Sequence, residues 1–270
     1  MTSTDKTRIE KYFDDAVNAK TLISFVTAGD PSPAHTVPAM HGLVAGGVDI
    51  LEVGIPFSDP EAEGPAIQAS SERALAQGMT LVKVLEMIQE FRRENTHTPV
   101  VLMGYLNSVL AMPNFSARAE KAGVDGLIMV NLPPEAGTTL QHELAAHNIN
   151  LIYLIAPTTS DERAEYILSQ SSGFVYYVSL KGITGASHLD TSAVAQKVAG
   201  LQRHTKLPIC VGFGIKNAEL AREVAKIADG VVVGSALVNL LSSYIDDVDA
   251  GSAAMQAEAK LLRQGVDEHG

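Results

Sequence analysis

A glutamate lies at the end of a short apolar run, where a strand would end. In ILEVG (50–54), alternate strand side chains point to opposite faces, so Glu52 shares a face with Ile50. With Leu51 and Val53 facing outward, Glu52 points into the interior, where desolvation raises the pKa of a carboxyl and suits it to proton transfer. A strand-end glutamate paired with a lysine or arginine is the alternative that this pattern leaves open.

An acidic segment follows this run. Asp59, Glu61 and Glu63 lie close together in the chain and are followed by glycine and proline. A solvated acidic loop is the common form of such a segment. The other interpretation is a second carboxylate that faces Glu52 across a substrate.

Three glycine-containing turns come late in the chain, namely GITG (182–185), GFGI (212–215) and GSA (234–236). Glycine lets the backbone approach a ligand closely, and the first N–H groups of a following helix carry partial positive charge. Three such turns in consecutive units predict a phosphate site built from main-chain amides. The net charge of −11 and the lack of a basic patch argue against nucleic acid as the main partner.

The sequence does not indicate a metal site, a cysteine nucleophile or a nucleotide site. The eight histidines form no metal-binding pair, so we interpret them as surface residues and predict no metal site. Cys210, the only cysteine, lies inside an apolar run and is expected to be a small buried side chain. The sequence contains neither a Gly-x-Gly-x-x-Gly nor a P-loop motif, so it does not support a nucleotide site.

Eight short apolar runs alternate with helical patterns, and each run suits a strand buried on both faces. The runs are 22–27, 48–53, 100–104, 126–130, 151–155, 174–179, 209–212 and 230–233. Helices are expected at about 33–45, 81–91, 114–122, 135–146, 160–169, 191–201, 218–227, 237–244 and 251–263. This alternation predicts a (β/α)8 TIM barrel, with an open doubly wound sheet as the alternative.

The predicted barrel has two additions. A helix at about 9–19 precedes the first strand, and 54–78 is expected to be a long loop after the second strand. We expect one domain over 1–270, with its core at about 9–263. In such barrels the reactive groups come from the carboxyl ends of the strands, which is where Glu52 falls.

The composition is that of an ordinary globular protein. The chain has 270 residues, of which 46% are hydrophobic, and this excludes a disordered or fibrous class. Its first residues lack the apolar segment of a signal peptide, and no stretch of about 18 apolar residues could span a membrane. We therefore expect a cytoplasmic protein.

Together the motifs resemble one known family. LEVGIPFSDP (51–60) followed by GPAIQ (64–68) is similar to the signature of the tryptophan synthase alpha chain. FVTAGDP (25–31), GYLN (104–107) and the three glycine turns agree in order and spacing, and the resemblance covers about 9–263. It implies a lyase of L-tryptophan biosynthesis that cleaves indole-3-glycerol phosphate to indole and D-glyceraldehyde 3-phosphate.

The resemblance also implies roles for single residues and for a partner. Glu52 and Glu63 would be the catalytic acids. The substrate-binding residues would be Phe25, Met103, Tyr105, Ile128, Leu154, Tyr176, Thr184 and Val232. The phosphate-binding residues would be Gly185, Phe213, Gly214, Gly234 and Ser235. The family works as an alpha2beta2 heterotetramer, in which the beta subunit carries pyridoxal phosphate (PLP) and receives the indole, while the alpha chain binds no cofactor.

Three residues depart from the family pattern. Glu63 stands where aspartate is usual and adds a methylene, Glu61 replaces an apolar residue, and Asn131 replaces an aspartate. Two alternative functions follow. One is a free-standing lyase that releases indole without a partner, and the other is a non-catalytic chain that binds phosphate ligands and regulates a beta subunit.

Overall fold

The computed structural model describes residues 6–16, 19–179, 191–212 and 214–268. Its strands form one parallel sheet in the order β5-β4-β3-β2-β1-β9-β8-β7-β6. The strands are β1 (Thr21–Thr27), β2 (Ile50–Gly54), β3 (Val100–Gly104), β4 (Gly126–Met129), β5 (Asn150–Ile152), β6 (Leu154–Ile155), β7 (Val175–Val178), β8 (Ile209–Gly212) and β9 (Gly230–Val233).

The two ends of this sheet are joined by the chain itself. β5 pairs with β4 and β6 pairs with β7, and only Tyr153 separates β5 from β6. The Tyr176 N–H donates to the Tyr153 carbonyl at 3.2 Å across this junction. The sheet therefore closes into a barrel, which rules out the open doubly wound sheet. The eight predicted strands are confirmed, and the predicted strand at 151–155 is divided into β5 and β6.

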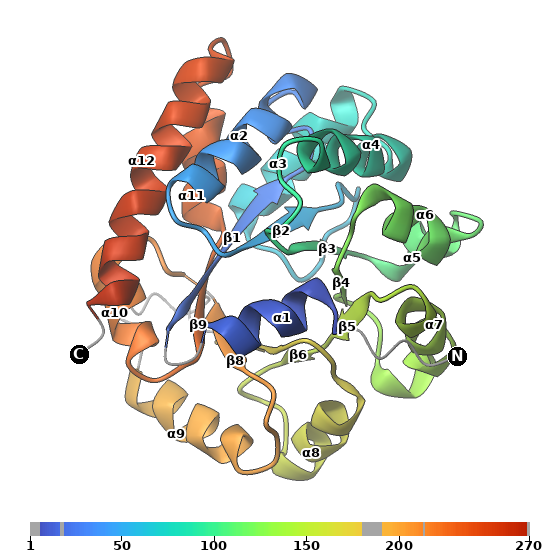
Figure 1. The fold of residues 1–270 in the computed structure, drawn as a ribbon, viewed down its shortest axis with the longest axis vertical. Helices are drawn as coiled ribbons and strands as arrows, with labels where there is room; N and C mark the ends of the chain where they lie inside the picture. The colour runs from blue at the N-terminus through green and yellow to red at the C-terminus, as the bar shows by residue number, and fades with distance from the viewer. Residues whose placement is uncertain (1–5, 17–18, 180–190, 213, 269–270) are drawn as a thin grey trace.

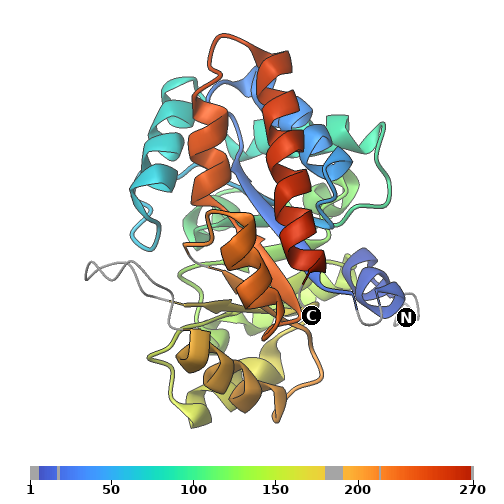
Figure 2. The same cartoon turned by 90° about the vertical axis from the view of Figure 1, so that its left-hand side faces the viewer.

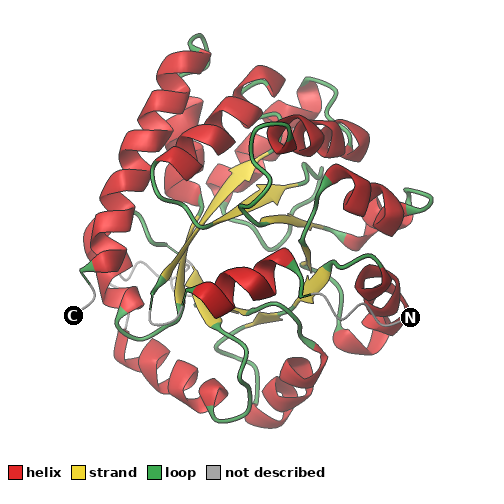
Figure 3. Cartoon of the chain, viewed as in Figure 1, coloured by secondary structure: helices red, strands yellow, loops and turns green. Residues whose placement is uncertain are grey.

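Helices lie around the outside of the strands, except α1, which lies across one end of the barrel (Figures 1 and 3). They are α1 (Arg8–Asp15), α2 (Pro33–Ala45), α3 (Pro65–Ala76), α4 (Leu81–Arg92), α5 (Leu106–Leu110), α6 (Phe115–Ala122), α7 (Pro134–Ala146), α8 (Asp161–Gln170), α9 (Thr191–Gln202), α10 (Ala218–Ala225), α11 (Ser235–Ser242) and α12 (Val248–Asp267). Of the helices in the described ranges, none combines the length and apolarity that crossing a membrane requires.

The strands separate the apolar core into two layers. Outward side chains such as Leu51 and Val53 pack in the layer between strands and helices, whereas Ile50 packs inside the barrel. Cys210 is fully buried in the inner layer, which confirms its prediction as a small core side chain. Because parallel strands covered on both faces bury every position, each strand is a nearly continuous apolar run.

Helix α1 closes the amino-terminal end of the barrel and lies across the strands in Figure 1. Thr7 begins it with a capping box, in which the Thr7 side chain accepts from the Glu10 N–H and the Glu10 side chain accepts from the Thr7 N–H. Ile9 is fully buried in the inner layer, and the Phe13 ring lies 6.1 Å from the Phe174 ring. One end of the barrel is thus filled, and the carboxyl ends of the strands lie at the other.

Helix α12 packs along α2, and Figure 2 shows α12 on the outside of the molecule. Small residues allow the close approach, since a Cβ atom on Gly46 would lie 2.4 Å from the Cβ of Ala259. The Ser252 hydroxyl donates to the Pro38 carbonyl at 2.7 Å. This hydrogen bond ties α12 to α2 through a side-chain donor.

Helix α3 corrects one prediction. The sequence predicts a single long loop over 54–78, but the second half of that segment is helical. Pro65 occupies the first helical position, where the missing N–H costs nothing. The buried face of α3 consists of Ser70, Ser71 and Ala74 instead of large apolar side chains, so the usual apolar periodicity is too weak to indicate a helix.

Candidate active site

Glu52 points into the barrel, as the alternation along β2 predicts. It pairs in register with Phe25 of β1 and Val101 of β3, and only 1% of its surface is exposed. Its Oε2 atom has no hydrogen-bond partner among the described residues. Burial raises the pKa of Glu52 to about 8, and the nearby Glu63 carboxyl contributes to the increase. No cation among the described residues lowers this pKa, so within them the ion-paired alternative does not hold, and Glu52 is a buried acid.

Glu63 reaches the same site from the loop after β2. The chain turns just before it, with the Glu63 N–H donating to the Pro60 carbonyl at 3.2 Å, and α3 begins two residues later. The Tyr105 hydroxyl donates a hydrogen bond to the Glu63 carboxyl. Burial raises the pKa of Glu63, and this hydrogen bond opposes the increase. Glu63 is thus half-buried, whereas Asp59 and Glu61 are exposed and form the solvated part of the acidic segment.

An apolar pocket separates the acidic groups from solvent at the carboxyl ends of β1, β2 and β3. Phe25, Ile55, Phe57, Met103 and Tyr105 line it together with Glu63. The Phe57 and Tyr105 rings stack with centroids 4.7 Å apart and planes 15° from parallel. The structure therefore brings three of the predicted substrate-binding residues, Phe25, Met103 and Tyr105, around one pocket with a predicted acid, Glu63.

The remaining described substrate-binding candidates lie in the inner layer of the barrel. Ile128, Leu154, Tyr176 and Val232 belong to this layer. Burial and the adjacent Glu52 carboxyl raise the pKa of Tyr176 well above its ordinary value, which places the phenol beside the buried acid. A Cβ atom on Gly212 would lie 2.5 Å from the Tyr176 hydroxyl oxygen, so glycine leaves space for this phenol.

Two of the three predicted phosphate-binding turns lie side by side. β8 and β9 are neighbours in the sheet, so Gly214 and Gly234 follow adjacent strand ends. Gly214 has a φ of +68°, and no atom of the described residues lies within 4 Å of an added Cβ atom, while Gly234 caps α11 and leaves Ser235 exposed at its first position. The N–H groups that begin α11 can receive an anion. The other candidates, Thr184, Gly185 and Phe213, lie outside the described residues.

The tertiary structure adds contacts that the sequence did not indicate. The Thr27 and Ser70 hydroxyls share a buried hydrogen bond of 2.6 Å, and the Asp30 carboxylate accepts from Arg73 at 2.6 and 3.1 Å. The two contacts fasten α3 to the end of β1 and to the segment after it, and α3 directly follows the loop that carries Glu63. Neither pair has a local sequence signal, because each joins residues 43 positions apart.

The histidine prediction needs one correction. His35 is 2% exposed, and its ring contacts the Ser32 hydroxyl at 2.8 Å and the Tyr244 carbonyl at 2.9 Å. It joins α2 to the segment after α11, which is a structural role. Within the described ranges, no group of three or more metal-ligating side chains forms a metal site.

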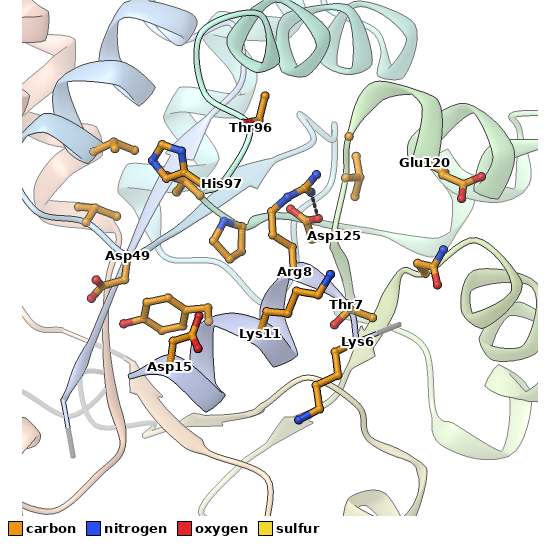
Figure 4. Close-up of a pocket in the computed structure, with 18 of the residues that line it drawn as sticks. Lys6, Thr7, Arg8, Lys11, Asp15, Asp49, Thr96, His97, Glu120 and Asp125 are labelled. Carbon is orange, nitrogen blue, oxygen red and sulfur yellow. Dashed lines mark hydrogen bonds and ion pairs between the residues drawn. The ribbon is translucent and has the colours of Figure 1, made fainter. Parts of the chain in front are cut away.

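Another cleft lies beside α1 at the amino-terminal end of the barrel (Figure 4). Its volume is about 940 Å³, and Asp49, Pro99, Asp125 and Asn148 line it from the segments that precede β2 to β5. Arg8 forms an ion pair with Asp125 there (Figure 4). Groups at this end of such a barrel support stability, so the buried acids at the opposite end mark the candidate active site.

Known proteins are similar to this chain over nearly its whole length. The family profile described as "Tryptophan synthase alpha chain" matches residues 13–267. The tryptophan synthase alpha chain of Thioalkalivibrio sulfidiphilus is 49% identical over 264 residues, covering 96% of this chain and 99% of that one.

Solved structures agree with this relation. Tryptophan synthase subunit alpha from Legionella pneumophila superposes with a TM-score of 0.90 at 42% identity, covering 97% of this chain and 99% of that chain. A protein from Pyrococcus furiosus, described as part of a tryptophan synthase a2b2 complex, superposes with a TM-score of 0.82 at 35% identity, covering 90% and 97%. The chain therefore belongs to the tryptophan synthase alpha chain family.

Proposed function

We propose that this chain is the lyase subunit of a tryptophan synthase and cleaves indole-3-glycerol phosphate to indole and D-glyceraldehyde 3-phosphate. The observation that carries the proposal is Glu52, a buried carboxyl at the carboxyl end of the barrel with no cation partner in the part of the chain that the structure describes. Its pKa of about 8 keeps the carboxyl protonated at neutral pH, as a proton donor requires.

The reaction is a retro-aldol cleavage of the bond between indole C3 and the glycerol chain. C3 is protonated first, which makes the ring a better leaving group, and the adjacent glycerol hydroxyl then loses its proton. Glu52 donates the first proton and, as a carboxylate, accepts the second. Each proton transfer of this kind contributes a rate factor of about 10²–10⁴. Tyr176, whose phenol lies beside Glu52, is assigned to the region of the reacting hydroxyl.

Glu63 is assigned to the indole N–H. Protonation at C3 places positive charge on the ring, and a carboxylate beside the nitrogen stabilises that charge as it develops. The Tyr105 hydroxyl donates to Glu63 and so favours its charged form. The two acids thus have different proposed roles, with Glu52 as the proton donor and Glu63 as the group that stabilises charge on the ring.

The rest of the site orients the substrate. The apolar side chains of Phe25, Met103, Ile128, Leu154 and Val232 are assigned to the indole ring. The phosphate is assigned to Gly214, Gly234 and Ser235, together with Thr184, Gly185 and Phe213. The pocket beside Glu63 encloses about 10 Å³, which is room for about one water molecule, so ligand binding requires the lining side chains to rearrange.

A beta subunit is the proposed partner. The relative from Pyrococcus furiosus is described in an a2b2 complex, which supports this assignment. In the proposed heterotetramer the beta subunit holds the PLP and uses the indole, and this chain contributes no cofactor. We further propose that residues 1–270 form one domain that works in the cytoplasm, where a single unpaired thiol such as Cys210 is usual.

The proposal is tested by measuring indole release from indole-3-glycerol phosphate with and without a beta subunit. We expect release that the beta subunit accelerates, and Glu52→Gln should abolish it while binding of indole-3-propanol phosphate is retained. Glu61→Gln is the matched control, because Glu61 is exposed in the same acidic segment.

Each other outcome contradicts the proposal in a defined way. Release that is equally fast without a partner would indicate a free-standing lyase. No release in either state would indicate a regulatory chain. Near-normal turnover of Glu52→Gln would remove Glu52 from the reaction.

A further inference from the structure

Tyr105 has a hydroxyl group with two well-defined partners. It donates to Oε2 of Glu63, and its oxygen accepts the Ala62 N–H at 3.1 Å. Because the Tyr105 oxygen accepts a hydrogen bond from the Ala62 N–H, the hydroxyl hydrogen of Tyr105 is directed at the Glu63 carboxyl. Tyr105 thereby contacts both the side chain of Glu63 and the backbone just before it, and it does so from the position directly after β3, 42 positions away in sequence.

The Tyr105 side chain is itself held in place. Its ring is 5% exposed and stacks on Phe57, with centroids 4.7 Å apart. The backbone beside it is fixed as well, since the Leu106 N–H donates to the Asn131 Oδ1 atom at 2.9 Å. Asn131 therefore satisfies the first free N–H of α5 and ties the segment after β4 to the segment after β3. The Tyr105 side chain has little conformational freedom and can therefore orient the more flexible side chain of Glu63.

Glu63 needs such an anchor, because it has three side-chain torsions and belongs to a loop. A second contact holds its backbone, where the Gln68 amide donates to the Glu63 carbonyl at 2.8 Å. Among the described residues, the Tyr105 hydroxyl is the side-chain donor to this carboxyl, and the backbone N–H groups of Ala62 and Glu63 also favour its charged form. The Tyr105 hydrogen bond engages Oε2, which leaves Oε1 as the atom that can accept a hydrogen bond from a substrate.

We propose that Tyr105 is a positioning residue for Glu63, holding the carboxylate so that one oxygen remains directed at the substrate nitrogen. The inference rests on the proposed function, in which Glu63 stabilises positive charge on the indole. It differs from the role of Tyr105 as part of the apolar wall, because the wall requires the ring, whereas positioning requires the hydroxyl.

The test is a double-mutant cycle in the complex with the beta subunit, using Tyr105→Phe, Glu63→Ala and the double variant. Tyr105→Phe keeps the ring and its stack on Phe57, so the fold is retained. Losing a hydrogen bond to a charged group should lower kcat about 10- to 100-fold, with less than about a 2-fold change in KM. In the Glu63→Ala background the same change should alter kcat less than about 2-fold, because no carboxylate remains to be held. Tyr166→Phe, at an exposed position on α8, is the matched control.

The outcomes separate this inference from the proposed function. Equal fold losses from Tyr105→Phe in both backgrounds would show that the hydroxyl acts independently of Glu63, and the inference would fail while the proposed function stands. A rise in KM alone would assign Tyr105 to the substrate-binding wall and also overturn the inference. An unchanged kcat for Glu63→Ala would instead overturn the role of Glu63, and with it that part of the proposed function.

Discussion

Burial of the Glu52 carboxyl should make the folding free energy depend on pH in a way that Glu52→Gln removes. The ordinary pKa of a glutamate is 4.5, and that of Glu52 in the folded protein is about 8. Between these two values the unfolded chain releases its proton at this position while the folded protein keeps it. The unfolded state then binds fewer protons, so stability falls as the pH rises from about 4.5 to about 8.

The magnitude follows from the two pKa values. Their difference, from 4.5 to about 8, corresponds to about 5 kcal/mol at about 1.4 kcal/mol per pKa unit. Glutamine cannot ionise, so Glu52→Gln should be about as stable as the wild type near pH 4.5 and more stable by up to about 5 kcal/mol at pH 8 and above. The acid proposed to carry out the reaction therefore destabilises the fold at neutral pH.

Urea denaturation followed by far-ultraviolet circular dichroism at pH 4.5, 6, 7 and 8 would measure this difference. Glu61→Gln should show no pH-dependent gain, because its side chain is exposed. Parallel stability curves for the wild type and Glu52→Gln would refute the reasoning, since they would mean that folding leaves the pKa of Glu52 unchanged.

Three further predictions concern the site. The kcat/KM of the wild type should fall as the pH rises above about 8, because Glu52 then loses the proton that it must donate, and a profile that is flat to about pH 10 would contradict this. Glu63→Gln should lower the cleavage rate by a smaller factor than Glu52→Gln, and an unchanged rate would return Glu63 to the solvated-loop interpretation. Gly54→Ala should destabilise the protein by about 1–3 kcal/mol in thermal melts, because the new Cβ would lie 2.5 Å from the Phe25 ring. Gly64→Ala, with nothing within 4 Å, is its control, and equal melting temperatures of the two variants would speak against steric overlap.

Local patterns in the sequence were sufficient for the barrel and for the direction of Glu52. Alternation along 50–54 places Ile50 and Glu52 inside and Leu51 and Val53 outside, as the two core layers confirm. This works because a strand repeats every two residues and a buried strand tolerates few polar side chains. The same reasoning fails for α3, because its buried face is made of small and polar residues. One of them, Ser70, forms a hydrogen bond with Thr27 of β1, a contact that the sequence pattern does not reveal.

The environment of the acids was decided only by tertiary structure. The sequence placed Glu63 in an acidic segment and left open whether it was solvated, while its contact with Tyr105 and the stack on Phe57 depend on how the segments after β2 and β3 meet. Strand period and turn chemistry depend on neighbouring residues, so the chain alone specifies them. Desolvation and a hydrogen bond between distant positions depend on the packing of the whole barrel, so the pKa of a carboxyl becomes defined only when the barrel has closed around it.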